Sequence, residues 1–203
     1  MNYPKIKFAY NQTDSIDIII HGGSKGIESH FINKLFNAST NENHSTLAFN
    51  FPYLDRGDES SSGEELVEEQ DTIDNILDFL KRFSFKKIHF IAKSLGGIVL
   101  AKYIANNGER LTSFEIEVTI LGYVLGDIDL SGFTGRLTII QGSNDRFGNA
   151  DAVKDDLATK KLSEANVIEI EGADHSYRIP ETKEPKFEDE VVSLVFSDNN
   201  EIR

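Results

Sequence analysis

The chain has 203 residues, of which 21 are lysine or arginine and 34 are aspartate or glutamate, giving a formal net charge of -13. This charge would repel the phosphates of nucleic acids and the headgroups of anionic lipids, so we expect no nucleic acid partner. The absence of cysteine excludes disulfides, thiolate nucleophiles and cysteine-ligated metals. The length and the 39% hydrophobic content suit a single domain over residues 1–203.

Neither a targeting segment nor a membrane span is evident in the sequence. Residues 1–10 are largely polar and carry two lysines with no apolar run behind them, unlike a secretory signal. The apolar runs are only a few residues long, far short of the roughly 20 that cross a bilayer. We therefore expect a cytoplasmic protein without a membrane partner.

Short apolar runs rich in β-branched residues alternate with amphipathic segments, a pattern typical of parallel strands alternating with helices. In chain order, the predicted strands are residues 5–10, at one edge, then 16–20, 46–51, 87–92, 118–124, 137–141 and 167–170. The predicted helices are 26–36, 65–83, 95–107, 150–161 and 185–196. Residues 126–135 are too few for a usual crossover helix, so we expect irregular chain there. The result is an α/β fold with six to seven strands and helices on both faces.

A serine lies at the turn between a buried-type strand and a buried-type helix in residues 88–97. This segment resembles the nucleophile elbow G-x-S-x-G of α/β-hydrolases, with Ala92 in the first glycine position. The turn is sharp, so the residues two positions on either side of Ser94 must be small, and Ala92 and Gly96 meet that demand. The resemblance implies that Ser94 is a nucleophile and that the amide of Leu95 helps to stabilise an oxyanion.

Residues 21–24, His-Gly-Gly-Ser, follow the first central strand. They resemble the family's His-Gly loop, which supplies the second oxyanion donor. The resemblance implies the amide of Gly23 as that donor, with Ser24 as the alternative. A simple glycine turn capped by Ser24 would give the same residues.

The family order of catalytic residues is serine, acid and histidine, each in a loop after a strand. Residues 142–148 follow a predicted strand and resemble the acid-bearing loop, which implies Asp145 as the acid. Residues 171–176 follow the next strand and resemble the histidine loop, which implies His175 as the base.

Two other carboxylates are alternatives for the acid. Asp127 follows an earlier strand, where some family members carry the acid. Asp174 is adjacent to His175, too close in sequence to fold back onto the ring of its neighbour.

No residue pattern indicates a metal site or a cofactor. The resemblance therefore implies a small serine hydrolase without a lid, similar to esterases, thioesterases or dienelactone hydrolases. It would cleave a carboxylic ester or thioester of a small molecule through an acyl-enzyme on Ser94, with Asp145 and His175 completing the triad. The alternative is an inactive hydrolase fold that serves as a binding or scaffold protein. The sequence assigns neither a role to Lys93 nor an oligomeric state.

Overall fold

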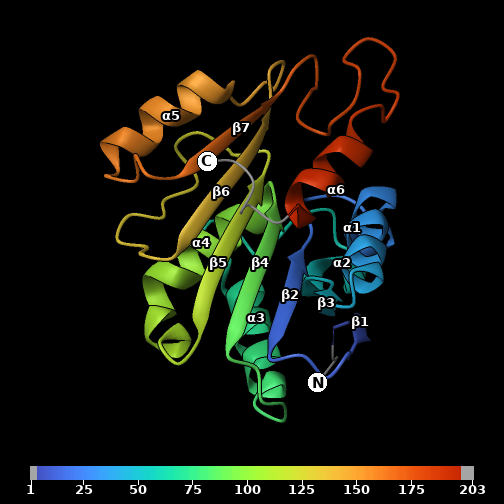
Figure 1. Cartoon of the computed structure of the whole chain (residues 1–203), viewed down its shortest axis with the longest axis vertical. Coiled ribbons are helices and arrows are strands. Elements are labelled where there is room, and N and C mark those ends of the chain that lie inside the picture. Colours follow the sequence, from blue (N-terminus) through green and yellow to red (C-terminus); the bar gives the residue numbers. More distant parts are fainter. Residues whose placement is uncertain (1–3, 198–203) are drawn as a thin grey trace.

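A computed structural model describes residues 4–197, which form one seven-stranded sheet in the order β1-β3-β2-β4-β5-β6-β7 (Figure 1). Only β1 is antiparallel to its neighbour. The strands are β1 (Ile6–Ala9), β2 (Ser15–Ile20), β3 (Ser45–Phe49), β4 (Lys87–Lys93), β5 (Glu115–Leu121), β6 (Arg136–Gly142) and β7 (Asn166–Ile170). The predicted α/β class, mostly parallel sheet and edge strand are confirmed.

The helices also follow the predicted order, with one addition. They are α1 (His30–Asn41), α2 (Pro52–Arg56), α3 (Val67–Leu80), α4 (Leu95–Asn107), α5 (Ala150–Thr159) and α6 (Glu188–Phe196), with short 3-10 turns at Gly26–Glu28 and Gly108–Leu111. The sequence analysis missed α2, which begins at Pro52 and ends at Gly57 with a φ of 79°. Residues 122–135, between β5 and β6, contain no helix, as expected, and so no helical lid.

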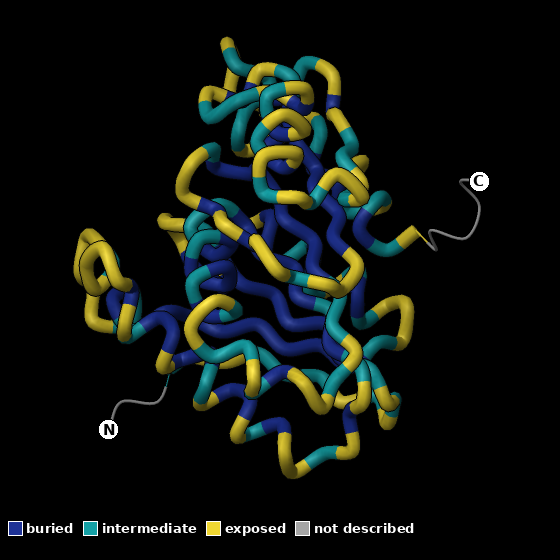
Figure 2. Tube along the Cα trace, turned by 90° about the vertical axis from the view of Figure 1, so that its left-hand side faces the viewer, coloured by how far each residue is buried: buried dark blue, intermediate teal, exposed yellow. Residues whose placement is uncertain are grey.

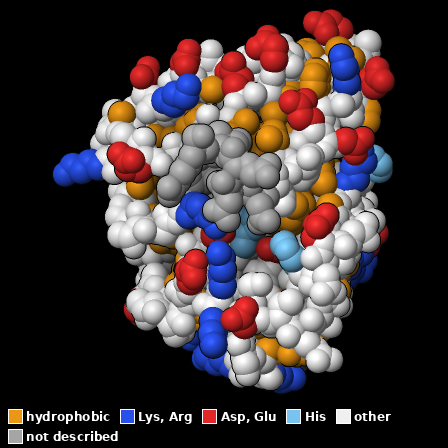
Figure 3. Space-filling model, viewed as in Figure 1, with side chains coloured by type: hydrophobic (Ala, Val, Ile, Leu, Met, Phe, Trp, Pro, Cys, Tyr) orange, Lys and Arg blue, Asp and Glu red, His pale blue; other side chains and the backbone are white. Residues whose placement is uncertain are grey.

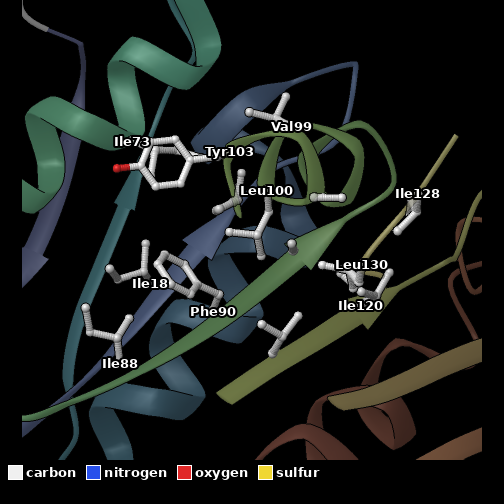
Figure 4. Packing of buried hydrophobic residues seen from close by; sticks show 14 of the residues in the cluster. Ile18, Ile73, Ile88, Phe90, Val99, Leu100, Tyr103, Ile120, Ile128 and Leu130 are labelled. Atoms are coloured by element: carbon white, nitrogen blue, oxygen red, sulfur yellow. The ribbon is translucent and has the colours of Figure 1, made fainter. Parts of the chain in front are cut away.

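The central strands are buried on both faces, which explains their nearly continuous apolar character (Figure 2). Ile18 and Phe90 pack on the face covered by α3 and α4 (Figure 4), whereas Ile19 and Ile91 pack on the face covered by α1 and α6. Helix α4 is itself buried deeply through Val99 and its neighbours. Packing on both faces therefore fixes the position of each central strand along the sheet, and with it the position of the strand's end.

The register of the parallel strands brings their carboxyl ends to one edge. Ile20 of β2 pairs with Ala92 of β4, and Lys93 of β4 pairs with Leu121 of β5. Gly142 of β6 likewise pairs with Ile170 of β7. Loops that begin right after these residues are therefore neighbours, and this edge is where open parallel sheets bind ligands.

A buried carboxylate is bound near the opposite edge of the sheet. Asp17 is 5% exposed and accepts hydrogen bonds from Ser39 Oγ at 2.6 Å and His44 Nδ1 at 2.8 Å. His89 Nδ1 lies 3.3 Å from its other oxygen. Burial alone would raise the pKa of Asp17, but the bonds from His44, His89 and Ser39 outweigh it and hold that pKa well below its ordinary value.

We predict that Asp17→Ala lowers the free energy of unfolding by about 3 kcal/mol, because it removes the buried carboxylate that binds Ser39 and His89 in the interior. Urea denaturation at neutral pH measures the loss. The difference from the wild type should shrink below about pH 4, where the carboxyl of Asp17 in the unfolded chain binds a proton. Because the pKa of Asp17 is lowered in the folded state, this protonation favours unfolding and removes the stability that the carboxylate contributes.

The matched control is Asp151→Ala, because Asp151 is 87% exposed and its nearest cation, Lys154, lies 3.5 Å away. We expect this control to change stability by less than about 0.5 kcal/mol. Equal losses in the two variants would contradict the importance of the buried network.

Candidate active site

Ser94 lies in a strained turn between β4 and α4. Its backbone has φ 50° and ψ -112°, which a residue with a side chain rarely adopts. Its amide donates to Leu121 O of β5 at 3.0 Å, so the turn is tied to the neighbouring strand. A conformation of this kind is kept where the surrounding structure enforces it.

Gly96 permits the close approach of α4 to the end of β2. A Cβ atom at this position would lie 2.7 Å from His21 O and 2.8 Å from Ile20 O, closer than real Cβ contacts come. Ala92, on the strand side of Ser94, is fully buried. The steric demand for small residues on both sides of Ser94 is therefore met in the structure.

The side chains of Ser94, His175 and Asp145 form a chain of hydrogen bonds. Ser94 Oγ lies 2.8 Å from His175 Nε2, and His175 Nδ1 lies 2.7 Å from Asp145 Oδ2. With a neutral imidazole, Nδ1 donates to the carboxylate and Nε2 accepts from the hydroxyl. The loops after β4, β6 and β7 thus bring together three residues that are far apart in the sequence.

The other two carboxylates considered for the acid role lie elsewhere in their loops. Asp127 is exposed, and the described part of the chain shows no bond between it and His175. Asp174 turns back to its own loop, where its oxygens accept from the amides of Ser176 and Arg178 and from Lys183 Nζ.

Asp145 is held by two further donors. Gln141 Nε2 donates to Asp145 Oδ2 at 3.0 Å, and the amide of Phe147 donates to Oδ1 at 2.9 Å. Gln141 also accepts from the amide of Tyr123 at 2.7 Å, so β6 positions both loops. The sequence analysis missed Gln141, whose only signal is an amide at the end of an apolar strand. These donors orient the carboxylate toward the imidazole.

His175 is mostly enclosed, and its side chain is 15% exposed. The ring of Phe147 meets it edge to face with centroids 4.7 Å apart. Burial lowers the pKa of His175 below its ordinary value; the hydrogen bond to Asp145 opposes this shift, and the positive charge of Lys93 adds to it. The imidazole is therefore neutral near pH 7 and can accept a proton.

Lys93, immediately before the serine, points into the protein under the histidine loop. Its Nζ donates to His175 O at 2.7 Å and lies 5.4 Å from the centroid of the Tyr177 ring. Burial lowers the pKa of Lys93 to about 8, although the charge of Asp145 opposes the shift. This side chain anchors the histidine loop, a direction that the sequence could not show.

His21 fastens the loop after β2 beside the serine. The amide of Phe51 donates to His21 Nε2 at 3.0 Å, so His21 Nδ1 carries the proton and donates to Gly22 O at 2.5 Å. A Cβ atom on Gly22 would lie 3.5 Å from Ser94 Cβ. The residue next along this loop is Gly23, the predicted oxyanion donor.

Two backbone amides beside Ser94 have no hydrogen-bond acceptor within the described residues: one in the loop after β2 and one at the start of α4. Within the described residues, neither the amide of Gly23 nor that of Leu95 donates to an acceptor. A Cβ atom on Gly23 would lie 3.9 Å from Leu95 Cδ2, so the two residues are in contact range. Ser24, the alternative, is exposed to solvent.

An open cavity of about 490 Å³ lies beside Ser94. The loops after β2, β4, β6 and β7 line it together with the first turns of α1 and α6. Residues 4–197 hold no cluster of three metal-ligating side chains, and none of their helices is long and apolar enough to cross a membrane.

The chain belongs to the alpha/beta hydrolase family, because the family model described as an alpha/beta hydrolase domain matches residues 14–200. This finding agrees with the sheet order and with the elbow at Ser94. A comparison with the sequences of curated proteins finds no match.

Solved structures of the same fold are distant in sequence. An alpha-beta serine hydrolase homologue from Coxiella burnetii is 16% identical with a TM-score of 0.70, over 95% of this chain and 88% of that chain. A monoacylglycerol lipase from Paleococcus ferrophilus is 12% identical with a TM-score of 0.65, over 95% and 98%. An esterase from Pyrococcus furiosus is 14% identical with a TM-score of 0.64, over 95% and 86%. At these identities the likeness concerns the fold.

We predict that Gly96→Ala lowers the free energy of unfolding by about 1–3 kcal/mol, because the added methyl must push two backbone carbonyls away. Chemical denaturation measures the loss. The matched control is Gly108→Ala, where a Cβ atom meets nothing within 4 Å and the backbone is helical. The control should be neutral or stabilising by up to about 1 kcal/mol. A loss in the control as large as that in Gly96→Ala would refute the steric explanation.

Proposed function

We propose that this chain is a serine hydrolase that cleaves a carboxylic ester or thioester of a small molecule through an acyl-enzyme on Ser94. The observation that carries the proposal is the chain of hydrogen bonds at 2.8 and 2.7 Å from Ser94 through His175 to Asp145. Nucleophile, base and orienting acid in this order are what acyl transfer by serine requires. A cytoplasmic location is part of the same proposal.

The first half of the reaction acylates the serine. His175 Nε2 takes the hydroxyl proton as Ser94 Oγ attacks the acyl carbon, and Asp145 stabilises the imidazolium that forms. The imidazolium then gives its proton to the leaving oxygen or sulfur as the bond from the acyl carbon breaks. In the second half, His175 takes a proton from water as the water oxygen attacks the acyl carbon. It then gives this proton to Ser94 Oγ as the bond from the acyl carbon to the serine breaks and the acid leaves.

The negative charge that develops on the carbonyl oxygen needs donors in place beforehand. The amides of Gly23 and Leu95 suit this role because both lack an acceptor within the described residues and the two residues lie close together. The amide of Leu95 also starts α4, where the helix dipole favours negative charge.

We predict that Ser94→Ala lowers the hydrolysis of p-nitrophenyl acetate at least about a thousandfold, because it removes the hydroxyl that is hydrogen-bonded to His175 and forms the acyl-enzyme. A fluorophosphonate probe should label the wild type and leave both Ser94→Ala and His175→Ala unlabelled. Turnover is followed by release of p-nitrophenolate, and labelling by fluorescence of the denatured protein.

Ser84→Ala is the matched control, because Ser84 is an exposed serine outside the candidate site. It should retain full turnover and labelling. If Ser94→Ala turned over the ester as fast as the wild type, or if no serine were labelled in the wild type, the inactive binding or scaffold protein would become the better reading.

We predict that kcat/KM rises with pH along a limb whose midpoint lies below 6.5, since the base must be neutral and burial lowers the pKa of His175. Lys93→Met should move the midpoint upward, because it removes a positive charge that disfavours the imidazolium. The exposed Lys161→Met is the control and should leave the midpoint in place. A wild-type midpoint at or above 7 would count against this assignment of the base.

A further inference from the structure

The cavity beside Ser94 has a charge opposite to that of the chain as a whole. Its lining includes Lys25, Lys93, Arg146 and Arg178, but only one carboxylate, that of Glu188. The whole chain has 34 acidic and 21 basic residues, and acidic side chains are spread over the face in Figure 3. The basic lining is therefore a local reversal that the composition does not explain.

The single carboxylate of the lining does not neutralise these cations. The side chain of Glu188 is 2% exposed, and its Oε2 lies 2.8 Å from His30 Nδ1 and 3.6 Å from Lys34 Nζ. Lys34 lies on α1 and also pairs with Asp189 at 2.7 Å. The charge of Glu188 is thus matched locally by α1.

The exposed cations of the cavity, Lys25, Arg146 and Arg178, have no acidic partner among residues 4–197. Most other arginines of the described chain do form ion pairs, with nitrogen-to-oxygen distances of 2.7 or 2.8 Å for Arg56, Arg110 and Arg136. Nearby Asp174 is already occupied by two backbone amides and by Lys183. The three cations are therefore available to a ligand.

Arg146 is held close to the reacting groups. Its Cζ lies 4.7 Å from the centroid of the Phe147 ring, and that ring lies 4.7 Å from the centroid of His175. Arg178 follows His175 by three positions in the same loop, and Lys25 comes from the loop that carries Gly23. Three loops thus direct positive charge toward one cavity.

We propose that the substrate carries an anionic group, a carboxylate or a phosphate, which Arg146, Arg178 and Lys25 bind while Ser94 attacks the acyl carbon. This inference rests on the proposed hydrolase function. The planar guanidinium matches both anions with two parallel hydrogen bonds. A local positive field is also what an anionic substrate needs to approach a protein whose net charge is -13.

The test compares p-nitrophenyl esters of matched length. The first is the neutral pentanoate. The second is the monoester of glutaric acid, which has a carboxylate at the end of the acyl chain. The third is a pentanoate ester whose leaving nitrophenol has a phosphate group. For the wild type we expect a charged ester to exceed its neutral counterpart in kcat/KM by about tenfold, and this advantage to fall as salt is raised. Preference for the glutarate ester assigns the anion to the acyl group, and preference for the phosphate ester assigns it to the leaving group.

Arg146→Gln and Arg178→Gln should each reduce the ratio of kcat/KM for the charged over the neutral ester about tenfold, with a smaller effect of Lys25→Gln at the exposed rim. The matched control is Arg82→Gln, because Arg82 is an exposed arginine that lies 5.8 Å from the Phe79 ring and does not line this cavity. It should leave the ratio unchanged. Equal kcat/KM for charged and neutral esters in the wild type, or an unchanged ratio in the Arg146 and Arg178 variants, would overturn the inference.

A separate measurement distinguishes this inference from the proposed function. Glutarate and inorganic phosphate are titrated into the wild type and the two arginine variants, with the heat of binding as the readout. If no ester is hydrolysed but either anion binds in a manner that needs the arginines, the hydrolase function fails and the anion site stands. If esters are hydrolysed without charge preference and neither anion binds, the anion site fails and the hydrolase function stands.

Discussion

The close approach of α4 to the end of β2 is the constraint on which the candidate site depends. Gly96 lies directly against the carbonyls of Ile20 and His21, and a Cβ atom there would lie 2.8 and 2.7 Å from their oxygens. This contact brings the positive-φ turn at Ser94 and the loop that starts at Gly22 into one place. A wider separation would move the amide of Gly23 away from Ser94 and from the amide of Leu95, the two donors of the proposed oxyanion site.

Hydrogen bonds and charges then fix the orientation and the protonation state of His175. Asp145 accepts from Gln141, Phe147 and His175, so its carboxylate faces the imidazole. Lys93 donates to the backbone carbonyl of His175, and its positive charge disfavours protonation of the His175 ring. The histidine is therefore neutral near pH 7, and it lies beside a carboxylate whose hydrogen bond favours the charged ring.

The sequence predicts most of the strands and helices, because buried strands appear as short apolar runs and amphipathic helices as a repeat of apolar residues every three or four positions. It extends β5 too far, to residue 124, since nothing local shows that Gly122 has a φ of 70° beside Lys93 Nζ. The order of Ser94, Asp145 and His175 could be read from a family pattern. The roles of Gln141 and of the cations around the cavity could not, because they depend on which loops meet at the sheet edge.

Among residues 4–197, the two buried aspartates, Asp17 and Asp145, show why an aspartate beside a histidine is not by itself an active site. Asp17 binds His44 Nδ1 much as Asp145 binds His175 Nδ1, at 2.8 and 2.7 Å. Near Asp17, however, the hydroxyl of Ser39 donates to the carboxylate itself, so that serine is an extra donor to the acid and gains no base. At the other edge the hydroxyl meets Nε2 of the histidine instead. The direction of one hydrogen bond therefore distinguishes the network at Asp17 from the one for which we propose proton transfer.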